Sequence, residues 1–209
     1  MQDNNNKQEH MNTLYSIVNQ ISPIPPHLWK KAQPYFELKV LNKGDYLFHM
    51  EDKIEDFYFL IAGLARYYYL TEEGKEFNKS FAEKPGHLLS SISSVTKGDG
   101  SPFSVELLSK FTTLSIKYQD LLLLGKQHPE WNDLLLRIYE NLVIKKEKRE
   151  SDFLLLDARA RYEVFLNDYA MISKLVPNYH IASYLGISEV SLSRIRRDMK
   201  LTNVNDKNL

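Results

Sequence analysis

Hydrophobic positions near the start of the chain recur at helical spacing. The Asn-, Gln- and Lys-rich start is typical of disorder to about residue 10. A short amphipathic helix is then predicted from the apolar residues Leu14, Ile17, Val18 and Ile21. Prolines end it, and a second short helix is expected to begin near Pro26, a residue type favoured at the first helical position. The apolar contacts of this second helix are Leu28, Trp29 and Ala32.

The pattern changes between Phe36 and about Tyr118 to short runs of β-branched and aromatic residues separated by Gly-, Pro- and Asn-containing turns. Strands are expected at 38–40, 46–48, 57–61, 64–70, 77–82, 103–107 and 112–116. Many short strands at this spacing indicate a compact β-roll or sandwich.

Helical spacing returns after Tyr118. One helix is expected over 120–127, and His128-Pro129 separates it from a long helix that runs from Glu130 to about Leu156. The apolar stripe of the long helix must be buried, which requires another apolar surface as a cover. We expect this cover to be the same helix of a second copy, in a two-stranded dimer seam, with packing on the β-roll alone as the alternative. The expected seam residues are Trp131, Leu135, Ile138, Leu142, Phe153 and Leu156.

A helix-turn-helix is predicted over residues 180–197. Ala182 is small where the two helices must cross, and Gly186 suits the positive φ of the turn. Ser188 is a good N-cap for the second helix, with Glu189 in its positive first turn. The apolar positions expected to point inward are Ile181, Leu185, Ile187, Leu192 and Ile195.

The outward face of the second helix combines short polar groups near its start with arginines further along, as readout of the DNA major groove requires. Arg194 is the candidate for bidentate recognition of a guanine edge. An ordinary helical hairpin with a polar face is the alternative. The predicted DNA-binding residues are Ser188, Glu189, Val190, Ser191, Ser193, Arg194, Arg196 and Arg197.

Composition narrows the function classes. The formal net charge is zero and cysteine is absent, which excludes disulfides, thiolate catalysis and cysteine-ligated zinc or iron–sulfur sites. The six histidines are scattered without metal-ligand spacing, and no nucleophile with an adjacent base stands out. We therefore expect no enzyme, no metal site and no cofactor. The chain shows no apolar run long enough for a membrane span and no signal peptide, so a cytoplasmic protein without a membrane partner is expected.

At this point the chain resembles the Crp/Fnr family of transcription regulators over residues 23–200. The resemblance rests on the segments 43–48, 57–63 and 73–76, on Pro85-Gly86, and on the helix-turn-helix. It implies an α+β architecture: a jelly-roll-like β-roll sensor domain, a long dimerisation helix, and a C-terminal helix-turn-helix with little or no wing. The implied boundaries are a tail and short helix over 1–22, a cyclic-nucleotide-binding-like roll over 23–118, a dimer helix region over 119–157 with Asp157 at the hinge, and a DNA-binding domain over 158–209.

The resemblance also indicates where an effector would lie. In nucleotide-binding members of the family, a glutamate and an arginine flank the phosphate cassette and grip ribose and cyclic phosphate. The glutamate position falls on or beside His87 and Leu88, and the arginine stretch falls on 101–104, which reads Ser-Pro-Phe-Ser. Cyclic AMP in the usual pose is therefore not expected, because the phosphate would lack a paired cation. His87 as an axial haem ligand is a minor alternative to a free loop histidine. The candidate effector-pocket residues are His87, Leu88, Ser101, Phe103, Lys146 and Glu147.

Together these features predict a homodimeric regulator that binds double-stranded DNA at a roughly palindromic promoter site and contacts RNA polymerase, as the resemblance implies. An unidentified small-molecule effector is possible, but control by cyclic AMP is not expected. The alternative is a small-molecule sensor or binding module with a vestigial DNA domain.

Overall fold

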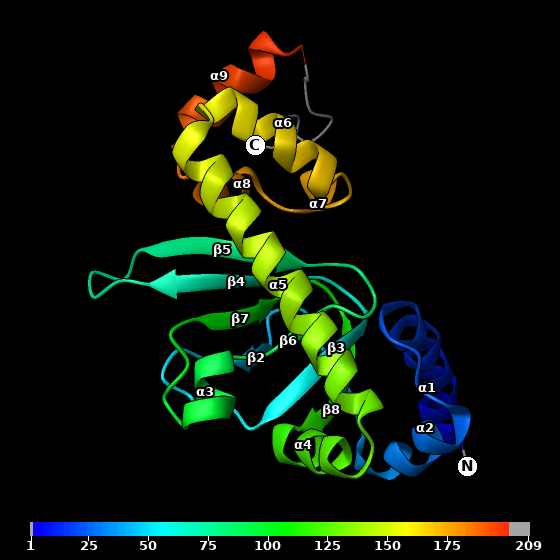
Figure 1. The fold of residues 1–209 in the computed structure, drawn as a ribbon. Coiled ribbons are helices and arrows are strands. Elements are labelled where there is room, and N and C mark those ends of the chain that lie inside the picture. Colours follow the sequence, from blue (N-terminus) through cyan, green and yellow to red (C-terminus); the bar gives the residue numbers. More distant parts are fainter. Residues whose placement is uncertain (1, 201–209) are drawn as a thin grey trace.

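The computed structural model describes residues 2–200. Two antiparallel sheets form a β-roll, and the long helix α5 (Glu130–Leu155) runs across it toward a cluster of C-terminal helices (Figure 1). The helices α1 (Gln2–Ile21) and α2 (Pro26–Ala32) lie at one side of the roll. The remaining helices are α3 (Ile92–Lys97), α4 (Tyr118–Gln127), α6 (Ala158–Asp168), α7 (Ile172–Leu175), α8 (Asn178–Leu185) and α9 (Glu189–Asp198). The architecture is thus α+β, as predicted.

The strands of the roll form two four-stranded sheets with the orders β1-β8-β3-β6 and β2-β7-β4-β5. All neighbouring strands pair antiparallel. Their bounds are β1 (Glu37–Leu41), β2 (Tyr46–Phe48), β3 (Asp56–Ala62), β4 (Ala65–Leu70), β5 (Glu76–Ala82), β6 (Leu88–Leu89), β7 (Ser104–Leu107) and β8 (Phe111–Lys117). Each of the seven predicted strands is present, with ends that differ by one residue at most.

Two elements of the roll escaped the sequence analysis. The strand β6 has only two residues, which is too short to show an alternation. The helix α3 is rich in serine and β-branched residues, which have modest helix propensity. Tertiary contacts hold it instead: the buried Ser94 hydroxyl accepts a hydrogen bond from the Ile54 amide at 2.6 Å.

The N-terminal helix is longer than expected. Disorder was predicted to about residue 10, but α1 begins at Gln2. Its second half packs on the core through Met11, Leu14 and Val18, all buried. Packing of this half offsets the cost of helix nucleation, and the preceding Gln, Lys and Glu side chains extend the helix at little further cost.

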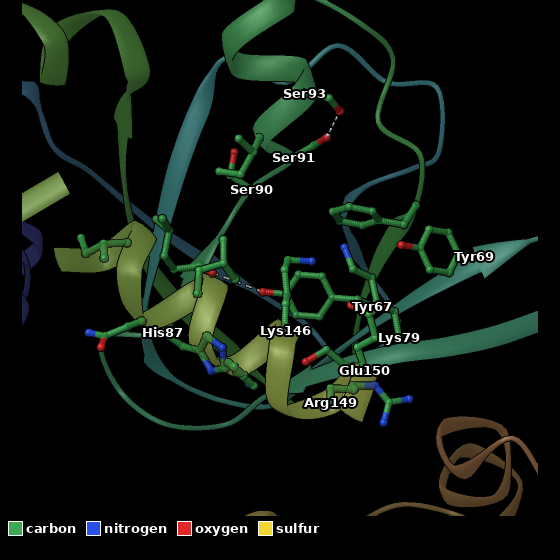
Figure 2. Close-up of a pocket in the computed structure, with 18 of the residues that line it drawn as sticks. Tyr67, Tyr69, Lys79, His87, Ser90, Ser91, Ser93, Lys146, Arg149 and Glu150 are labelled. Carbon is green, nitrogen blue, oxygen red and sulfur yellow. Dashed lines mark hydrogen bonds between the residues drawn. The ribbon is translucent and has the colours of Figure 1, made fainter. Parts of the chain in front are cut away.

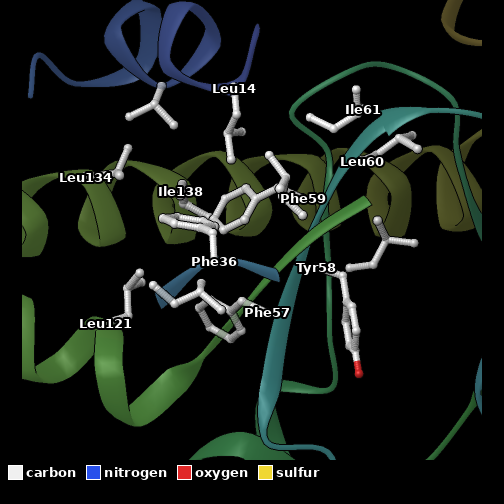
Figure 3. Close-up of a cluster of buried hydrophobic side chains, with 14 of the residues drawn as sticks. Leu14, Phe36, Phe57, Tyr58, Phe59, Leu60, Ile61, Leu121, Leu134 and Ile138 are labelled. Atoms are coloured by element: carbon white, nitrogen blue, oxygen red, sulfur yellow. The ribbon is translucent and has the colours of Figure 1, made fainter. Parts of the chain in front are cut away.

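The main core lies between the roll and the helices around it. In Figure 3, Leu14 of α1, Phe36, Phe59 of β3 and Ile138 of α5 converge on one apolar cluster. Trp131 of α5 stacks on Trp29 of α2, with ring centroids 6.0 Å apart. Burial of side chains of this size contributes about 1.5–3 kcal/mol each.

This core corrects the predicted dimer seam. Trp131, Leu135 and Ile138 are buried within their own chain, so the alternative of packing on the roll holds for this half of the stripe. The first two helices supply the cover that a second copy was expected to supply. The opposite side of α5 carries a different set of apolar residues, here called the outer face, which is exposed: Leu136, Val143, Ile144, Leu154 and Leu155.

The C-terminal helices have a second core that includes two residues of the roll. Leu64 and Phe81 are buried against apolar residues of α6 to α9. Phe81 lies 5.6 Å from the ring of Tyr184 and 5.8 Å from that of Tyr169, measured between centroids. At the start of this region the Asp157 carboxylate caps α6 by accepting a hydrogen bond from the Ala160 amide at 2.8 Å.

Hydrogen bonds also join β5 to α8. The Asn78 side chain donates to the carbonyl of His180 at 2.9 Å, and the Asn78 amide donates to the Ser183 hydroxyl at 2.9 Å. Asn78 also accepts a hydrogen bond from Arg66, whose guanidinium pairs with Glu76 at 2.6 Å and Glu106 at 2.5 Å. The roll therefore holds the first helix of the helix-turn-helix through buried, satisfied polar groups.

Candidate nucleic-acid interface and cavity

The turn between α8 and α9 has the geometry of a helix-turn-helix. Gly186 ends α8 in the left-handed region with φ of 69°, and the Ile187 amide donates to the Ala182 carbonyl at 3.0 Å. The Ser188 hydroxyl caps α9 by accepting from the Ser191 amide at 3.2 Å. Among the residues between the helices, those buried are Ile181, Ala182, Leu185 and Leu192, and those half-buried are Ile187 and Ile195.

The exposed side of α9, here called the reading face, consists of Glu189, Val190, Ser193, Arg194 and Arg197. Val190 is 61% exposed, an unusual position for a branched apolar residue. Arg194 makes no ion pair within residues 2–200, so its guanidinium is free to bind another molecule. Ser188 and Ser191 sit at the edge of this face, where their hydroxyls bond to each other at 2.9 Å.

Arg196 is a correction to the predicted DNA-binding set. It is only 5% exposed, and its Nε donates to the Tyr162 hydroxyl at 2.7 Å. A second hydrogen bond joins it to the Asn178 side chain. Arg196 lies one helical turn after the buried Leu192, so its side chain points inward and joins α9 to α6 and α8.

A cavity of about 780 Å³ lies between the roll and α5. In Figure 2, Lys79 and Tyr69 of the roll and Lys146 of α5 surround the space, with Ser90, Ser91 and Ser93 on the opposite wall. Four of the predicted effector residues line it: His87, Leu88, Phe103 and Lys146.

The other two predicted effector residues do not line the cavity. Ser101 is fully buried, and its hydroxyl donates to the Phe103 carbonyl at 2.7 Å, so it braces the strand rather than facing a ligand. Glu147 is exposed on α5 outside the cavity wall. Residues of α5 line the cavity at intervals of three and four, at 138, 141–142, 145–146, 149–150 and 153–154, and position 147 falls between them. Leu154, at the last of these positions, lies where the cavity lining meets the outer face.

The cavity contains cationic residues that the sequence analysis missed. The Lys79 ammonium lies 3.5 Å from the centroid of Phe103, and burial followed by the nearby Lys146 charge lowers the pKa of Lys79 to about 7. Arg149 lines the cavity and donates to the Tyr184 carbonyl of α8 at 2.7 Å, with its guanidinium 3.7 Å from the Tyr184 ring. A lysine in a strand ordinarily indicates a solvent-facing position, which is why Lys79 was not singled out.

His87 is neutral in this environment. Burial, followed by the charges of Lys145 and Lys84, lowers the pKa of His87 to about 3. No group of three or more His, Asp or Glu residues that could hold a metal ion occurs among the described residues. No helix within residues 2–200 is long and apolar enough to cross a membrane.

Comparison with known proteins finds one matching domain family and several solved structures of similar fold. Residues 38–128 match the family model of the cyclic nucleotide-binding domain. No curated protein matches the chain at a significant level. Among solved structures, the c-di-GMP responsive global regulator CLP of Xanthomonas campestris is similar, with 14% sequence identity, a TM-score of 0.68, and coverage of 84% of this chain and 92% of that chain.

Two further solved structures have a similar fold. FixK2 from Bradyrhizobium japonicum has 17% identity and a TM-score of 0.67 over 79% of this chain and 84% of that chain. A CooA variant from Carboxydothermus hydrogenoformans has 19% identity and a TM-score of 0.65 over 82% of this chain and 81% of that chain. The roll thus matches the cyclic nucleotide-binding domain, and most of the chain shares the fold of these solved structures.

Proposed function

We propose that this protein is a DNA-binding transcription regulator that reads the major groove with α9. The observation that carries the proposal is the reading face: an exposed polar and cationic surface on a helix whose opposite side is fixed by Leu192 and Arg196. A rigid support of this kind positions side chains within the narrow tolerance that base recognition requires.

The reading face divides into two functions. Val190 and Arg194 lie where α9 would meet base edges: Val190 would contact a thymine methyl group, and Arg194 would pair with the O6 and N7 atoms of a guanine. Arg197, one turn further along, would contact phosphate and fix the register without reading sequence. Glu189 and Ser193 complete the polar surface.

The test is selection of binding sites from random double-stranded DNA, followed by titration of the selected site and its single-base variants. Arg194→Ala is expected to weaken binding by about 1–3 kcal/mol and to lose discrimination at one base pair of each half-site. Arg197→Ala is expected to weaken all sequences alike. Lys53→Ala removes an equal charge from an exposed loop of the roll and serves as the control. Unchanged discrimination by Arg194→Ala would refute its assignment as a reader.

We further propose that the protein acts as a homodimer through the outer face of α5. Leu136, Val143 and Leu154 are separated by seven and eleven residues, close to two and three helical turns, so they lie along one line. A symmetric pairing of two such helices would bury this line and place two recognition helices about 34 Å apart, one turn of DNA. Because the dimer would be symmetric, its promoter site would be roughly palindromic. The resemblance to Crp/Fnr regulators suggests RNA polymerase as a partner.

Sedimentation tests the dimer. Wild type is expected to sediment as a dimer at micromolar concentration, and the double variant Leu136→Asp with Val143→Asp as a folded monomer. Val40→Asp changes an apolar residue of similar exposure on β1 and should leave the dimer intact. A monomeric wild type, or a double variant that stays dimeric, contradicts the proposed interface.

Cyclic AMP is not expected to control this regulator. The single arginine of the roll, Arg66, is occupied by Glu76 and Glu106. The positions that would grip the ribose and cyclic phosphate hold His87, which is neutral, and Ser101, which is buried. Titration calorimetry with cyclic AMP should show no binding at physiological concentration. A dissociation constant in the low micromolar range together with tighter DNA binding would overturn this conclusion.

A further inference from the structure

The strand β5 is the last strand in the order β2-β7-β4-β5, and α8 lies against it (Figure 1). A single side chain of α8 bonds to the backbone of this edge. The Ser183 hydroxyl accepts a hydrogen bond from the Asn78 amide at 2.9 Å and donates to the Glu76 carbonyl at 3.2 Å. One hydroxyl thus satisfies a donor and an acceptor of the edge, as a neighbouring strand would do. The first helix of the helix-turn-helix is therefore fixed to the backbone of the roll.

The long helix α5 holds the helix-turn-helix from another side. Arg149 donates to the Tyr184 carbonyl at 2.7 Å, and its guanidinium lies 3.7 Å from the centre of the Tyr184 ring. Four residues further along α5, the Phe153 ring lies against the turn between α8 and α9, where a Cβ built at Gly186 would come within 2.8 Å of it. Residues four apart lie on one side of a helix, one turn from each other. Two contacts a turn apart fix the angle between α5 and the helix-turn-helix as well as the distance.

These attachments matter for DNA binding because α5 also carries the outer face. In the proposed dimer the outer faces meet at the two-fold axis, so the position of each α9 relative to that axis depends on how its helix-turn-helix is attached. One additional base pair between two half-sites moves one of them by about 3.4 Å and rotates it by about 35° around the duplex. A helix-turn-helix that is fixed on two sides cannot follow this displacement without losing hydrogen bonds.

We propose that Ser183 and Arg149 are positioning residues that set the spacing of the two half-sites without contacting DNA. The inference rests on both parts of the proposed function, the reading face of α9 and the dimer through α5. Ser183 faces β5 and Arg149 faces α8, so neither side chain belongs to the reading face. Their loss should change the spacing that the protein prefers, whereas loss of Arg194 should change the base that it prefers.

The test measures affinity for the selected binding site and for versions whose central spacer is one base pair longer or shorter. Ser183→Ala removes both hydrogen bonds to β5, and Arg149→Met removes the donor to Tyr184 but keeps an apolar stem. Two matched controls accompany them. Ser173→Ala removes a serine hydroxyl whose partner is the Ala170 carbonyl in the same helical region, and Arg149→Lys keeps a cationic donor.

Wild type is expected to bind the altered spacers about tenfold or more weakly than the selected site, because each hydrogen bond that breaks costs a factor of about two to ten. In the double variant Ser183→Ala with Arg149→Met this ratio should fall to about threefold or less. Its preference at the base pair read by Arg194 should stay as in wild type, and both controls should keep the wild-type ratio. An unchanged spacing ratio in the double variant overturns the inference, and so does a loss of base preference.

A second measurement requires neither DNA nor a dimer. The chain has no cysteine, so Lys53→Cys on the roll and Asp198→Cys at the end of α9 provide two sites for spin labels. Pulsed dipolar spectroscopy on labelled protein diluted with unlabelled protein then measures the distance within one chain. We expect one narrow distance distribution without further substitutions and a broader one with Ser183→Ala and Arg149→Met. A broad distribution without them, or an equally narrow one with them, contradicts the proposed attachment.

The two proposals fail in different ways. If selection yields no DNA site for wild type, the proposed function fails and the spacing inference fails with it. If wild type binds its site but tolerates every spacer equally, the spacing inference alone fails. Each single variant leaves the other attachment intact, so the same measurements on Ser183→Ala and Arg149→Met separately decide the question if the double variant does not fold.

Discussion

The inward position of Arg196 on a helix proposed to read DNA leads to a prediction that separates support from recognition. Arg196→Met keeps the length of the side chain and its apolar stem but removes the guanidinium. Tyr162→Phe removes only the hydroxyl that accepts from Arg196 Nε. The two variants and their combination form a double-mutant cycle for one buried hydrogen bond between α9 and α6.

The structure sets the expected magnitude. The Nε–hydroxyl distance is 2.7 Å, and both Tyr162 and Arg196 are almost fully buried. A hydrogen bond from a charged donor contributes about 1.5–3 kcal/mol, and the orphaned hydroxyl of Tyr162 in Arg196→Met costs about 1–3 kcal/mol. The bond from Arg196 to Asn178 is lost in both Met variants, so its contribution cancels from the coupling energy.

Urea denaturation of the four proteins measures the free energy of unfolding. We expect a coupling energy of about 1.5–3 kcal/mol, with the double variant more stable than the sum of the single losses implies. The loss of DNA affinity in Arg196→Met should be uniform across base variants, unlike that in Arg194→Ala. A coupling energy near zero would refute the structural role assigned to Arg196, as would a base-specific loss of affinity.

Three further variants test other features. Gly186→Ala should destabilise the protein by about 1 kcal/mol or more, measured by denaturation, because alanine is strained at a φ of 69° and its Cβ would lie 2.8 Å from the Phe153 ring; unchanged stability would contradict this. Burial, followed by the charge of Arg66, lowers the pKa of His180 to about 4. In the unfolded state this histidine binds a proton already near pH 6.5, so the free energy of unfolding should fall as the pH drops from about 6.5 toward 4. His180→Gln should reduce that loss between pH 7 and 5, and an identical loss would exclude His180 as a contributor. Phe81→Ala should cost about 3–5 kcal/mol in the same assay, since Phe81 is fully buried in the second core; a loss below 1 kcal/mol would mean that this core closes over the gap.

The sequence predicts the helices and strands of this fold better than it predicts which of them pack together. Alternating strands and the Gly186–Ser188 turn depend on local chemistry, and the structure confirms both. Which surface buries the apolar stripe of α5 depends on the other apolar surfaces that the folded chain brings near it. Trp131 finds Trp29 within the same chain, a contact between residues about a hundred positions apart that periodicity cannot report.

The site residues show the same division. His87 and Phe103 could be placed at the cavity from the family resemblance, because those segments keep their order along the chain. Lys79 could not, because its burial results from the approach of α5 to β5 and not from its own strand. Arg196 could have been recognised: it follows Leu192 by four residues, and the helical period alone places it inward.

The second core has a consequence for attempts to separate or exchange the parts of this protein. Cutting the chain near Asp157 would leave Leu64 and Phe81 exposed on the roll fragment and would remove two apolar partners from the helical fragment. Asn78 and the His180 carbonyl would also lose each other as hydrogen-bond partners. The roll and the helix-turn-helix thus share a folding unit despite their separate positions along the chain, and a graft of this helix-turn-helix onto another roll would need a substitute for Phe81.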